Sequence, residues 1–253
     1  MIDRKSTETI KLMREGGAIL AHVMHEVGTN AREGISLLQL DRLANHLIIR
    51  AGAKPAFLGY RPAGATKAYP ATICASINDV IVHGVPTKYK LQRGDLLKLD
   101  FGLFYKGWCV DAAITVGIDP ISTEASKLIK VTKEALDKGI KAMCAGNRLG
   151  DIGYAIHRHV KKNGFNVADG LTGHGIGRKL HEDPPVFNVG KRGKGDLLET
   201  GVVLALEPMV TVGTSLIRQL ADESYVTADH KLSAHFEHTV AITKDGPLVL
   251  TQL

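Results

Sequence analysis

The stretch DLLKLDFGLFYKGWCVDAAITVG, residues 95–117, decides the fold because it predicts a β-hairpin with an acidic residue inside each apolar strand. Its two apolar runs flank Lys106-Gly107, which favours a tight turn between antiparallel strands. Asp100 and Asp111 are eleven residues apart across that turn, so we expect them roughly opposite each other on neighbouring strands. The hairpin therefore predicts two carboxylates within reach of one pair of ions.

A later part of the chain repeats this pattern. GDLLKLD ends at Asp100 and GVVLALE ends at Glu207, so each apolar run closes on a carboxylate six residues after a glycine. VDAAITV and FEHTVAIT then repeat the arrangement with Asp111 and Glu237. The repeat predicts two pseudo-symmetric halves, each of which supplies two acidic residues.

The segments around the hairpin follow the same plan. Helical spacing of apolar residues, and the capping-box pair Ser36 and Gln39, predict helices over 7–27, 36–51, 122–143 and 151–163. Strands are expected at 73–77 and 80–82, within 95–117 and along 165–253. Helices, strands, helices and strands in that order predict two similar αβ halves.

Composition describes an ordinary soluble globular protein. The 253 residues are 44% apolar and 23% charged, enough for one large domain or two small ones. No apolar run approaches the ~20 residues needed to span a bilayer, and the charged N-terminal stretch lacks the apolar core of a signal peptide. Three cysteines without a CxxC pair indicate free thiols in a reducing cytoplasm.

The net charge of +6 favours encounters with polyanions such as RNA. The basic residues are nevertheless dispersed, as in 126–143 and 190–195, which is typical of a solvated helix face and a basic loop. Aromatic residues are only 5% and no stacking motif is present, which argues against an RNA-binding domain.

Four carboxylates lie in apolar strand contexts, at Asp100, Asp111, Glu207 and Glu237. Each one alone could be an exposed strand residue, because strand side chains alternate between faces. That interpretation is weakest for Glu207, since VVLALEPM is apolar on both faces. Buried carboxylates need cations, and no Lys or Arg recurs beside all four, although Lys98 lies in one strand. One or two divalent metal ions account for the set better.

The stretch GHGIGRKLHEDP, residues 173–184, permits three interpretations: a phosphate loop, a metal site, or a glycine-rich turn with histidines nearby by chance. Its glycines alternate strictly and HEDPP blocks a following helix, so the spacing does not fit a phosphate-binding loop. Glycines allow close backbone approach, and His174 and His181 can point toward a common cavity. Carboxylates with an imidazole suit Mn²⁺, Fe²⁺ or Co²⁺ better than a thiolate-rich zinc site does.

Together these motifs resemble the type I methionine aminopeptidases, peptidases of family M24 with the pita-bread (creatinase/aminopeptidase) fold. The resemblance covers almost the whole chain, and it implies one catalytic domain over residues 1–253. The implied fold is of the α+β class, with two pseudo-symmetric αβ halves, an antiparallel sheet and the helices outside it. It rests on SINDVIVHGVP, KLDFG, GWCVDAA, GHGIGRKLHEDP, LALEPMV and SAHFEHTVAIT. The family's metal ligands fall on Asp100, Asp111, His174, Glu207 and Glu237.

The resemblance also implies the arrangement of two metal ions. Asp111 and Glu237 would bridge them, Asp100 would hold the ion that receives the substrate amine, and His174 and Glu207 would complete the other. Mn²⁺, Fe²⁺ or Co²⁺ is expected, with Zn²⁺ as an alternative. Glu207 is then the expected general base.

Two further histidines acquire roles from the resemblance. His181 would hydrogen-bond the scissile carbonyl oxygen and stabilise the oxyanion. His83 would contact the scissile amide or the leaving amine, whereas the motif alone favours a histidine bonded to backbone at a strand end.

The resemblance places a closed, mostly apolar methionine pocket near five further residues. Tyr69, Cys74 and Tyr225 are expected beside the pocket, with Leu180 and Phe57 at its mouth. Cys74 could equally be a buried apolar residue without a role.

The chain departs from the family pattern at several points. Ala112-Ala113 follows Asp111 where a hydroxyl residue is usual, which puts the strength of metal binding in doubt. The preceding WCVD lacks the usual His or Gly, Phe57 stands where many relatives have cysteine, and the loop 61–70 is longer than is common. These changes put peptide access and inhibitor sensitivity in doubt.

The resulting expectation is a cytoplasmic, monomeric enzyme that removes the initiator methionine from nascent proteins whose second residue is small. No membrane partner is expected, and the basic surface suggests docking on ribosomal RNA. Prolidase and aminopeptidase P are rivals with the same ligands, but they usually carry a large N-terminal domain. A non-catalytic binding protein of this fold is the other rival, and such proteins typically lose metal ligands.

Overall fold

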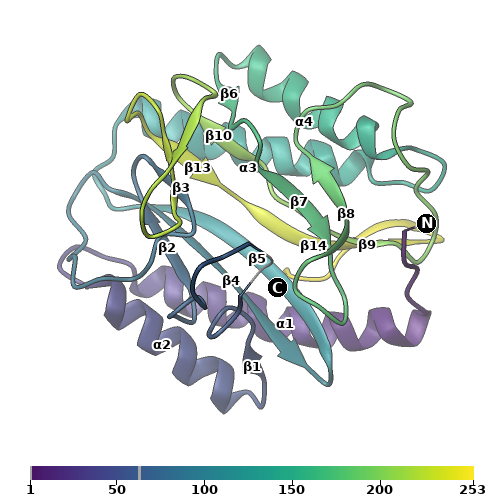
Figure 1. Ribbon diagram of the computed structural model, residues 1–253, viewed down its shortest axis with the longest axis horizontal. Helices are drawn as coiled ribbons and strands as arrows, with labels where there is room; N and C mark the ends of the chain where they lie inside the picture. Colours follow the sequence, from purple (N-terminus) through teal and green to yellow (C-terminus); the bar gives the residue numbers. More distant parts are fainter. Residues whose placement is uncertain (1, 62–63) are drawn as a thin grey trace.

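The computed structural model describes residues 2–61 and 64–253, which form four helices and fifteen strands (Figure 1). The helices are α1 (Thr7–Asn30), α2 (Leu37–Arg50), α3 (Thr123–Ala142) and α4 (Leu149–Lys162). The strands of the first half are β1 (Lys54–Pro55), β2 (Cys74–Ile77), β3 (Val80–Val82), β4 (Leu96–Tyr105) and β5 (Trp108–Gly117). Those of the second half are β6 (Asn166–Val167), β7 (Thr172–Gly175), β8 (Glu182–Phe187), β9 (Val203–Leu206), β10 (Met209–Thr211), β11 (Ile217–Gln219), β12 (Tyr225–Thr227), β13 (Ser233–His235), β14 (Glu237–Thr243) and β15 (Gly246–Val249).

One antiparallel sheet joins the two halves. Its strands run in the order β1-β4-β5-β14-β9-β7-β8, with β2 also paired to β4 and β15 to β14. The halves meet where β14 pairs with β5, at Glu237↔Ala113 and His238↔Ala112. Two small sheets, β13-β10-β6 and β11-β12-β3, complete the fold. In Figure 1 α1 and α2 lie below the strands and α3 and α4 lie above them, which confirms the predicted α+β class with two αβ halves.

Local capping interactions explain where the helices begin. Ser6 Oγ accepts a hydrogen bond from the Thr9 amide at 3.2 Å, and Ser122 Oγ does the same for the Ala125 amide at 3.1 Å. Ser36 and Gln39 form the predicted capping box. The starts of these helices were therefore predicted well. The predicted end of the first helix, residue 27, lies three residues before the observed end of α1 at Asn30.

The hairpin turns at Lys106-Gly107, as predicted, with both residues at positive φ, 48° and 81°. The expected pairing needs one correction. The turn pairs Tyr105 with Trp108, so Asp111 lies opposite Gly102, and Asp100 is its diagonal neighbour on the same face. A Cβ atom at Gly102 would lie 3.1 Å from Asp111 Oδ1, so the glycine leaves room for this carboxylate.

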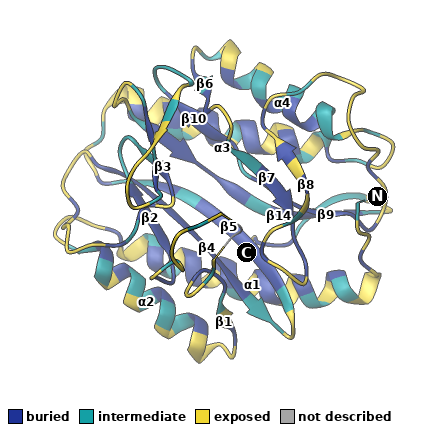
Figure 2. Cartoon of the chain, viewed as in Figure 1, coloured by how far each residue is buried: buried dark blue, intermediate teal, exposed yellow. Residues whose placement is uncertain are grey.

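Each half buries its own apolar core between helices and sheet. α1 packs on β4 and β5, and α2 packs against α1 and β1, around residues such as Leu20, Leu40 and Phe101. α3 and α4 pack against each other and against strands such as β13 and β8, around a second core that includes Leu128 and Ile156. The strands at the centre are mostly buried, with some residues of intermediate exposure, as Figure 2 shows. The cores thereby hold the central strands rigidly in register.

Two smaller expectations concern the surface and loops. No helix in the described ranges has the length and apolar character needed to cross a bilayer. Residues 62–63 of the loop expected over 61–70 lie outside the described residues.

Candidate metal centre

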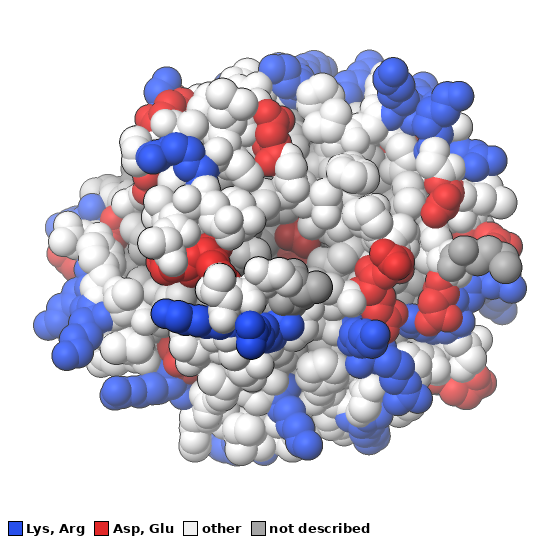
Figure 3. All heavy atoms as spheres, in the orientation of Figure 1, with Lys and Arg blue, Asp and Glu red and all other residues white. Residues whose placement is uncertain are grey.

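Five neighbouring strands or strand ends bring the predicted ligands together. Asp100 lies on β4, Asp111 on β5 and His174 on β7, while Glu207 directly follows β9 and Glu237 begins β14. All five line one cavity of about 790 Å³. The space-filling view shows a hollow with acidic atoms at its floor (Figure 3). The strand register thus converts residues spread over 137 positions into one cluster.

Three of the four carboxylates are buried, the side chain of Glu207 is 13% exposed, and no Lys or Arg among the described residues pairs with any of them. Asp111 and Glu237 are only 3% and 2% exposed, and Asp100 Oδ1 and Glu237 Oε1 have no hydrogen-bond partner in the described chain. Burial raises the pKa of Asp111 to about 7, and it raises the pKa of Asp100, Glu207 and Glu237 well above the usual range. Buried carboxylate oxygens without hydrogen-bond partners are suited to bind divalent cations.

Lys98 does not neutralise this cluster. Its side chain is fully buried, and its Nζ donates a 2.7 Å hydrogen bond to the carbonyl oxygen of Asn78. Burial lowers its pKa to about 7. The basic residue noted in the sequence therefore serves a neighbouring turn.

His174 has the environment of a metal ligand. Its Nδ1 lies 2.9 Å from the carbonyl oxygen of Gly175, so an Nδ1–H donated there leaves Nε2 free to bind a metal. Nε2 lies 3.6 Å from Glu207 Oε1 and 4.0 Å from Glu237 Oε1. Burial lowers the pKa of His174 to about 4, which keeps the ring neutral. Asp111, His174 and Glu237 each offer a ligand atom within 4.8 Å of the others.

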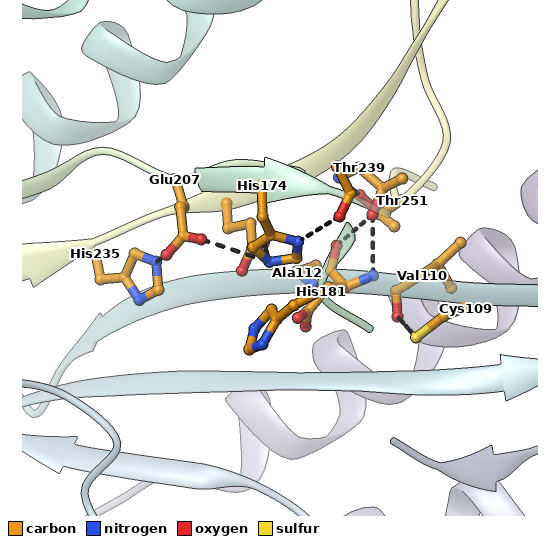
Figure 4. A network of polar contacts seen from close by, with 12 residues as sticks. Cys109, Val110, Ala112, His174, His181, Glu207, His235, Thr239 and Thr251 are labelled. Atoms are coloured by element: carbon orange, nitrogen blue, oxygen red, sulfur yellow. Dashed lines mark hydrogen bonds and ion pairs between the residues drawn. The ribbon is translucent and has the colours of Figure 1, made fainter. Parts of the chain in front are cut away.

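A residue absent from the predicted set also faces the cluster. His235, at the end of β13, is 1% exposed, and its Nε2 lies 3.4 Å from Glu207 Oε2. Figure 4 shows Glu207 between His235 and His174. The signal was available in SAHFEH, because a residue two positions before Glu237 points to the same face of an extended strand.

Two threonine hydroxyls hold the strands at the metal centre, where the regular ladder ends. Thr239 Oγ1 accepts from the Asp111 amide at 2.9 Å and donates to the Asp111 carbonyl oxygen at 2.8 Å. Thr115 Oγ1 accepts from the His235 amide at 2.9 Å and donates to its carbonyl oxygen at 2.7 Å. Each hydroxyl thus replaces a missing pair of backbone hydrogen bonds and fixes one residue of the centre.

The two other predicted histidines also line the cavity. His181 stacks edge-on against His174 with ring centroids 4.4 Å apart, and its Nδ1 lies 2.8 Å from the Tyr60 hydroxyl. Burial lowers the pKa of His181 to about 3. His83 has a left-handed φ of 63° after β3 and contacts Tyr225 edge-on at 5.7 Å. Sequence reasoning missed Tyr60, because nothing local links it to a residue 121 positions away.

All five predicted pocket residues lie on the cavity wall, namely Phe57, Tyr69, Cys74, Leu180 and Tyr225. The Tyr69 hydroxyl lies 3.1 Å from the Ile73 carbonyl oxygen and 3.0 Å from that of Gly84, which fixes its ring. Cys74 pairs with Asp100 in the sheet, and burial raises the pKa of its thiol well above the usual range. The pocket is therefore apolar around an uncharged thiol, and the individual roles of its residues stay predictions.

Ala113 occupies a central place in the strand register. It pairs with Asp100 on one side and with Glu237 on the other, and it is 1% exposed. Ala113 is part of the Ala112-Ala113 pair that departs from the family pattern. Its methyl group lies between the predicted ligands Asp100 and Glu237, where a hydroxyl side chain would offer a hydrogen bond.

Comparisons with known proteins bear on this centre. The model of metallopeptidase family M24 matches residues 11–244. A methionine aminopeptidase from Clostridium perfringens is 44% identical over 252 residues, which cover 99% of this chain and 99% of that protein. A crystal structure of methionine aminopeptidase from Rickettsia prowazekii superposes with a TM-score of 0.95 at 33% identity, covering 99% of this chain and 100% of that one.

The rival within the fold is more distant. Prolidase from Pyrococcus furiosus has a TM-score of 0.79 at 20% identity, and the match covers 99% of this chain but only 65% of that protein. Such a match shows a shared fold alone. The chain belongs to metallopeptidase family M24 and, within it, to the methionine aminopeptidases.

Proposed function

We propose that this protein is a dimetal aminopeptidase that removes the N-terminal methionine of nascent proteins whose second residue is small. The observation that carries this proposal is the convergence of four carboxylates, three of them buried, and His174 on one cavity, in a chain that matches methionine aminopeptidases along its full length. One catalytic domain over residues 1–253 is part of the proposal.

Asp100, Asp111, His174, Glu207 and Glu237 are the residues proposed to hold the two ions. Bound there, the ions would polarise the scissile carbonyl group and lower the pKa of a water molecule. The donor set of carboxylate oxygens and one imidazole favours Mn²⁺, Fe²⁺ or Co²⁺, with Zn²⁺ as an alternative.

The protein's own groups then move protons and stabilise charge. Glu207 is proposed to take the proton of the attacking water, because burial raises the pKa of its carboxyl toward that of a useful base. A Tyr60 hydroxyl that donates to His181 Nδ1 leaves the proton on Nε2, which can then donate to the carbonyl oxygen as it becomes negative. His83 is proposed to contact the leaving amine.

Substrate choice would follow from the shape of the cavity. Phe57, Leu180 and Cys74 are buried apolar side chains that suit an unbranched methionine side chain. The second residue of the peptide would lie beside the buried ligands, so a small residue is favoured there. Tyr69 and Tyr225 complete the wall.

Location and partners belong to the same proposal. We propose a monomeric cytoplasmic enzyme, consistent with cysteines that form no disulfide. Docking on ribosomal RNA through dispersed Lys and Arg side chains is supported by the net charge of +6 and by the basic groups spread around the face in Figure 3.

The test is methionine release from a Met-Gly-Met peptide by metal-depleted protein titrated with Mn²⁺, Fe²⁺ or Co²⁺. We expect release of the first residue only, and a loss of at least about 100-fold in kcat/KM for Glu207→Ala. A peptide with leucine in second place should be cleaved poorly. An Ala-Pro dipeptide should remain intact.

Two results would overturn the proposal. Cleavage of Ala-Pro without methionine release would indicate a prolidase. Metal binding without hydrolysis of any of these peptides would favour a non-catalytic binding protein.

A further inference from the structure

The backbone of His235 is fixed more firmly than its place at the end of a three-residue strand requires. β13 pairs with β10 through Met209↔His235, and Thr115 Oγ1 bonds both the amide and the carbonyl oxygen of His235 from the other side. The residue is 1% exposed. Its side chain therefore starts from a rigid position, which is what a group that orients another side chain needs.

The ring of His235 meets Glu207 from the side opposite His174. His235 Nε2 lies 3.4 Å from Glu207 Oε2, while Glu207 Oε1 lies 3.6 Å from His174 Nε2 (Figure 4). Each oxygen of Glu207 thus faces a different imidazole. Neither nitrogen of His235 makes a hydrogen bond among the described residues, and the 3.4 Å approach of Nε2 to Glu207 Oε2 is a contact between two ionisable groups without regular hydrogen-bond geometry.

Two roles are chemically open to such a ring: a metal ligand, or a hydrogen-bond donor to Glu207. A metal-binding histidine usually donates its second ring N–H to an acceptor, as His174 Nδ1 can to Gly175. A His235 bound to metal through Nε2 would carry a buried Nδ1–H without any acceptor in the described chain. A buried donor without a partner is rare and costly. Glu207, His235 and Glu237 each offer a ligand atom within 4.8 Å of the others, so ligation is sterically open, but the Nδ1–H without an acceptor disfavours it.

The donor role satisfies more of the buried groups. A neutral imidazole has one N–H donor and one acceptor nitrogen. Glu207 Oε2 is the acceptor that the surroundings offer for this proton. With the proton on Nε2, the nitrogen without a partner is Nδ1, which is then an acceptor and not a buried N–H donor.

We propose that His235 is a positioning residue whose Nε2–H donates to Glu207 Oε2 and holds the carboxylate with Oε1 turned toward His174. This inference rests on the proposed function for its role in catalysis, but its geometric part does not. Glu207 is the proposed general base and a metal ligand, so free rotation of its carboxylate would weaken both roles. His235 touches neither substrate nor metal in this proposal and acts through Glu207.

The first experiment compares His235→Leu with His235→Gln. The side-chain amide of glutamine can donate to Glu207, whereas leucine cannot. Calorimetric titration of metal-free protein with Mn²⁺ should show about 10- to 100-fold weaker binding for His235→Leu and recovery to within about 3-fold for His235→Gln. His159→Leu, which removes a 3.0 Å histidine–glutamate contact outside the cavity, should bind Mn²⁺ as the unaltered protein does.

A second measurement covers the case in which His235→Leu fails to fold. Long-range ¹H–¹⁵N spectra of the unaltered metal-free protein report the tautomer of each histidine. We expect His235 in the Nε2–H form, and an Nδ1–H form would overturn the proposal whatever the variants do.

The remaining outcomes are also decisive. Unchanged Mn²⁺ affinity in a folded His235→Leu protein would refute the positioning role. Equal weakening in both variants, together with shifted absorption bands of the Co²⁺-loaded His235→Gln protein, would show that His235 is itself a ligand. If affinity follows the expected pattern while the unaltered protein releases no methionine, the positioning role stands and the proposed function fails.

Discussion

Replacing Thr239 by valine removes a buried hydroxyl that makes two hydrogen bonds with the backbone of Asp111. Thr239 is 0% exposed, and its Oγ1 lies 2.9 Å from the Asp111 amide and 2.8 Å from the Asp111 carbonyl oxygen. Valine has nearly the same shape, so the change deletes the hydrogen bonds and creates little empty space. Both backbone groups of Asp111 then lose a partner at a point where β5 and β14 no longer form a ladder.

The expected loss follows from these two groups. A buried donor or acceptor left without a partner costs about 1–3 kcal/mol, so the loss of both partners should lower the free energy of unfolding by about 2–6 kcal/mol. Because Asp111 is a predicted ligand, Mn²⁺ affinity should fall about 10- to 100-fold as its backbone shifts. Urea unfolding of metal-free protein measures the first quantity, and calorimetric titration measures the second.

Thr132→Val is the matched control. Thr132 is equally buried, but its hydroxyl donates at 2.8 Å to the Leu128 carbonyl oxygen within α3, an acceptor that the helix already uses. This variant should lose less than about 1 kcal/mol and keep its Mn²⁺ affinity. If Thr239→Val loses no more stability than Thr132→Val, the reasoning about the Asp111 backbone is refuted.

Three further predictions concern other parts of the molecule. Burial raises the pKa of Asp111 to about 7, so the native metal-free protein keeps a proton that the unfolded chain releases near its usual pKa. Its stability should fall by up to roughly 1.4 kcal/mol per pH unit for each such proton as pH rises from about 3.8 to about 7, and Mn²⁺ should release protons on binding at pH 7; unfolding curves at two pH values inside that range, and calorimetry in two buffers, check this, and a flat stability profile within the range would contradict it. At Gly17 a Cβ atom would lie 2.0 Å from the Leu250 carbonyl oxygen, so Gly17→Ala should lower the free energy of unfolding by about 3 kcal/mol in urea, and a neutral result would mean that α1 can move away. Tyr60→Phe removes the hydroxyl 2.8 Å from His181 Nδ1 and should lower kcat/KM for Met-Gly-Met about 10-fold, or ~1.4 kcal/mol, with unchanged unfolding; equal activity would exclude a role for Tyr60 in fixing the tautomer.

Local sequence signals predicted much of the fold. Ser36 with Gln39 marks a helix start through hydrogen bonds within four residues, and Lys106-Gly107 marks a turn through its own backbone angles. The repeated carboxylates were also visible, because an acidic residue inside an apolar strand contradicts its surroundings. These features depend on interactions within short stretches of chain, so the local sequence is enough to predict them.

The parts that were missed depend on which distant segments become neighbours. The partner of His181 is Tyr60, 121 positions away, and the partner of the His235 backbone is Thr115, 120 positions away. No periodicity within a strand encodes such a contact. The diagonal placement of Asp100 and Asp111 was missed for a smaller reason, since a two-residue turn fixes which residues pair.

The hydrogen bonds at the end of the chain also determine when the centre can form during synthesis. Leu250 N–H donates to the Thr239 carbonyl oxygen at 2.9 Å, and Thr251 Oγ1 accepts from the Thr239 amide at 3.2 Å. Thr239 in turn holds Asp111, which is made 140 residues before Thr251. A growing chain can therefore form the hairpin of β4 and β5 early. The hydrogen bonds that Thr239 makes with Asp111 can form only after Thr239 has been translated, and those that fix Thr239 itself only after Leu250 and Thr251 have been translated.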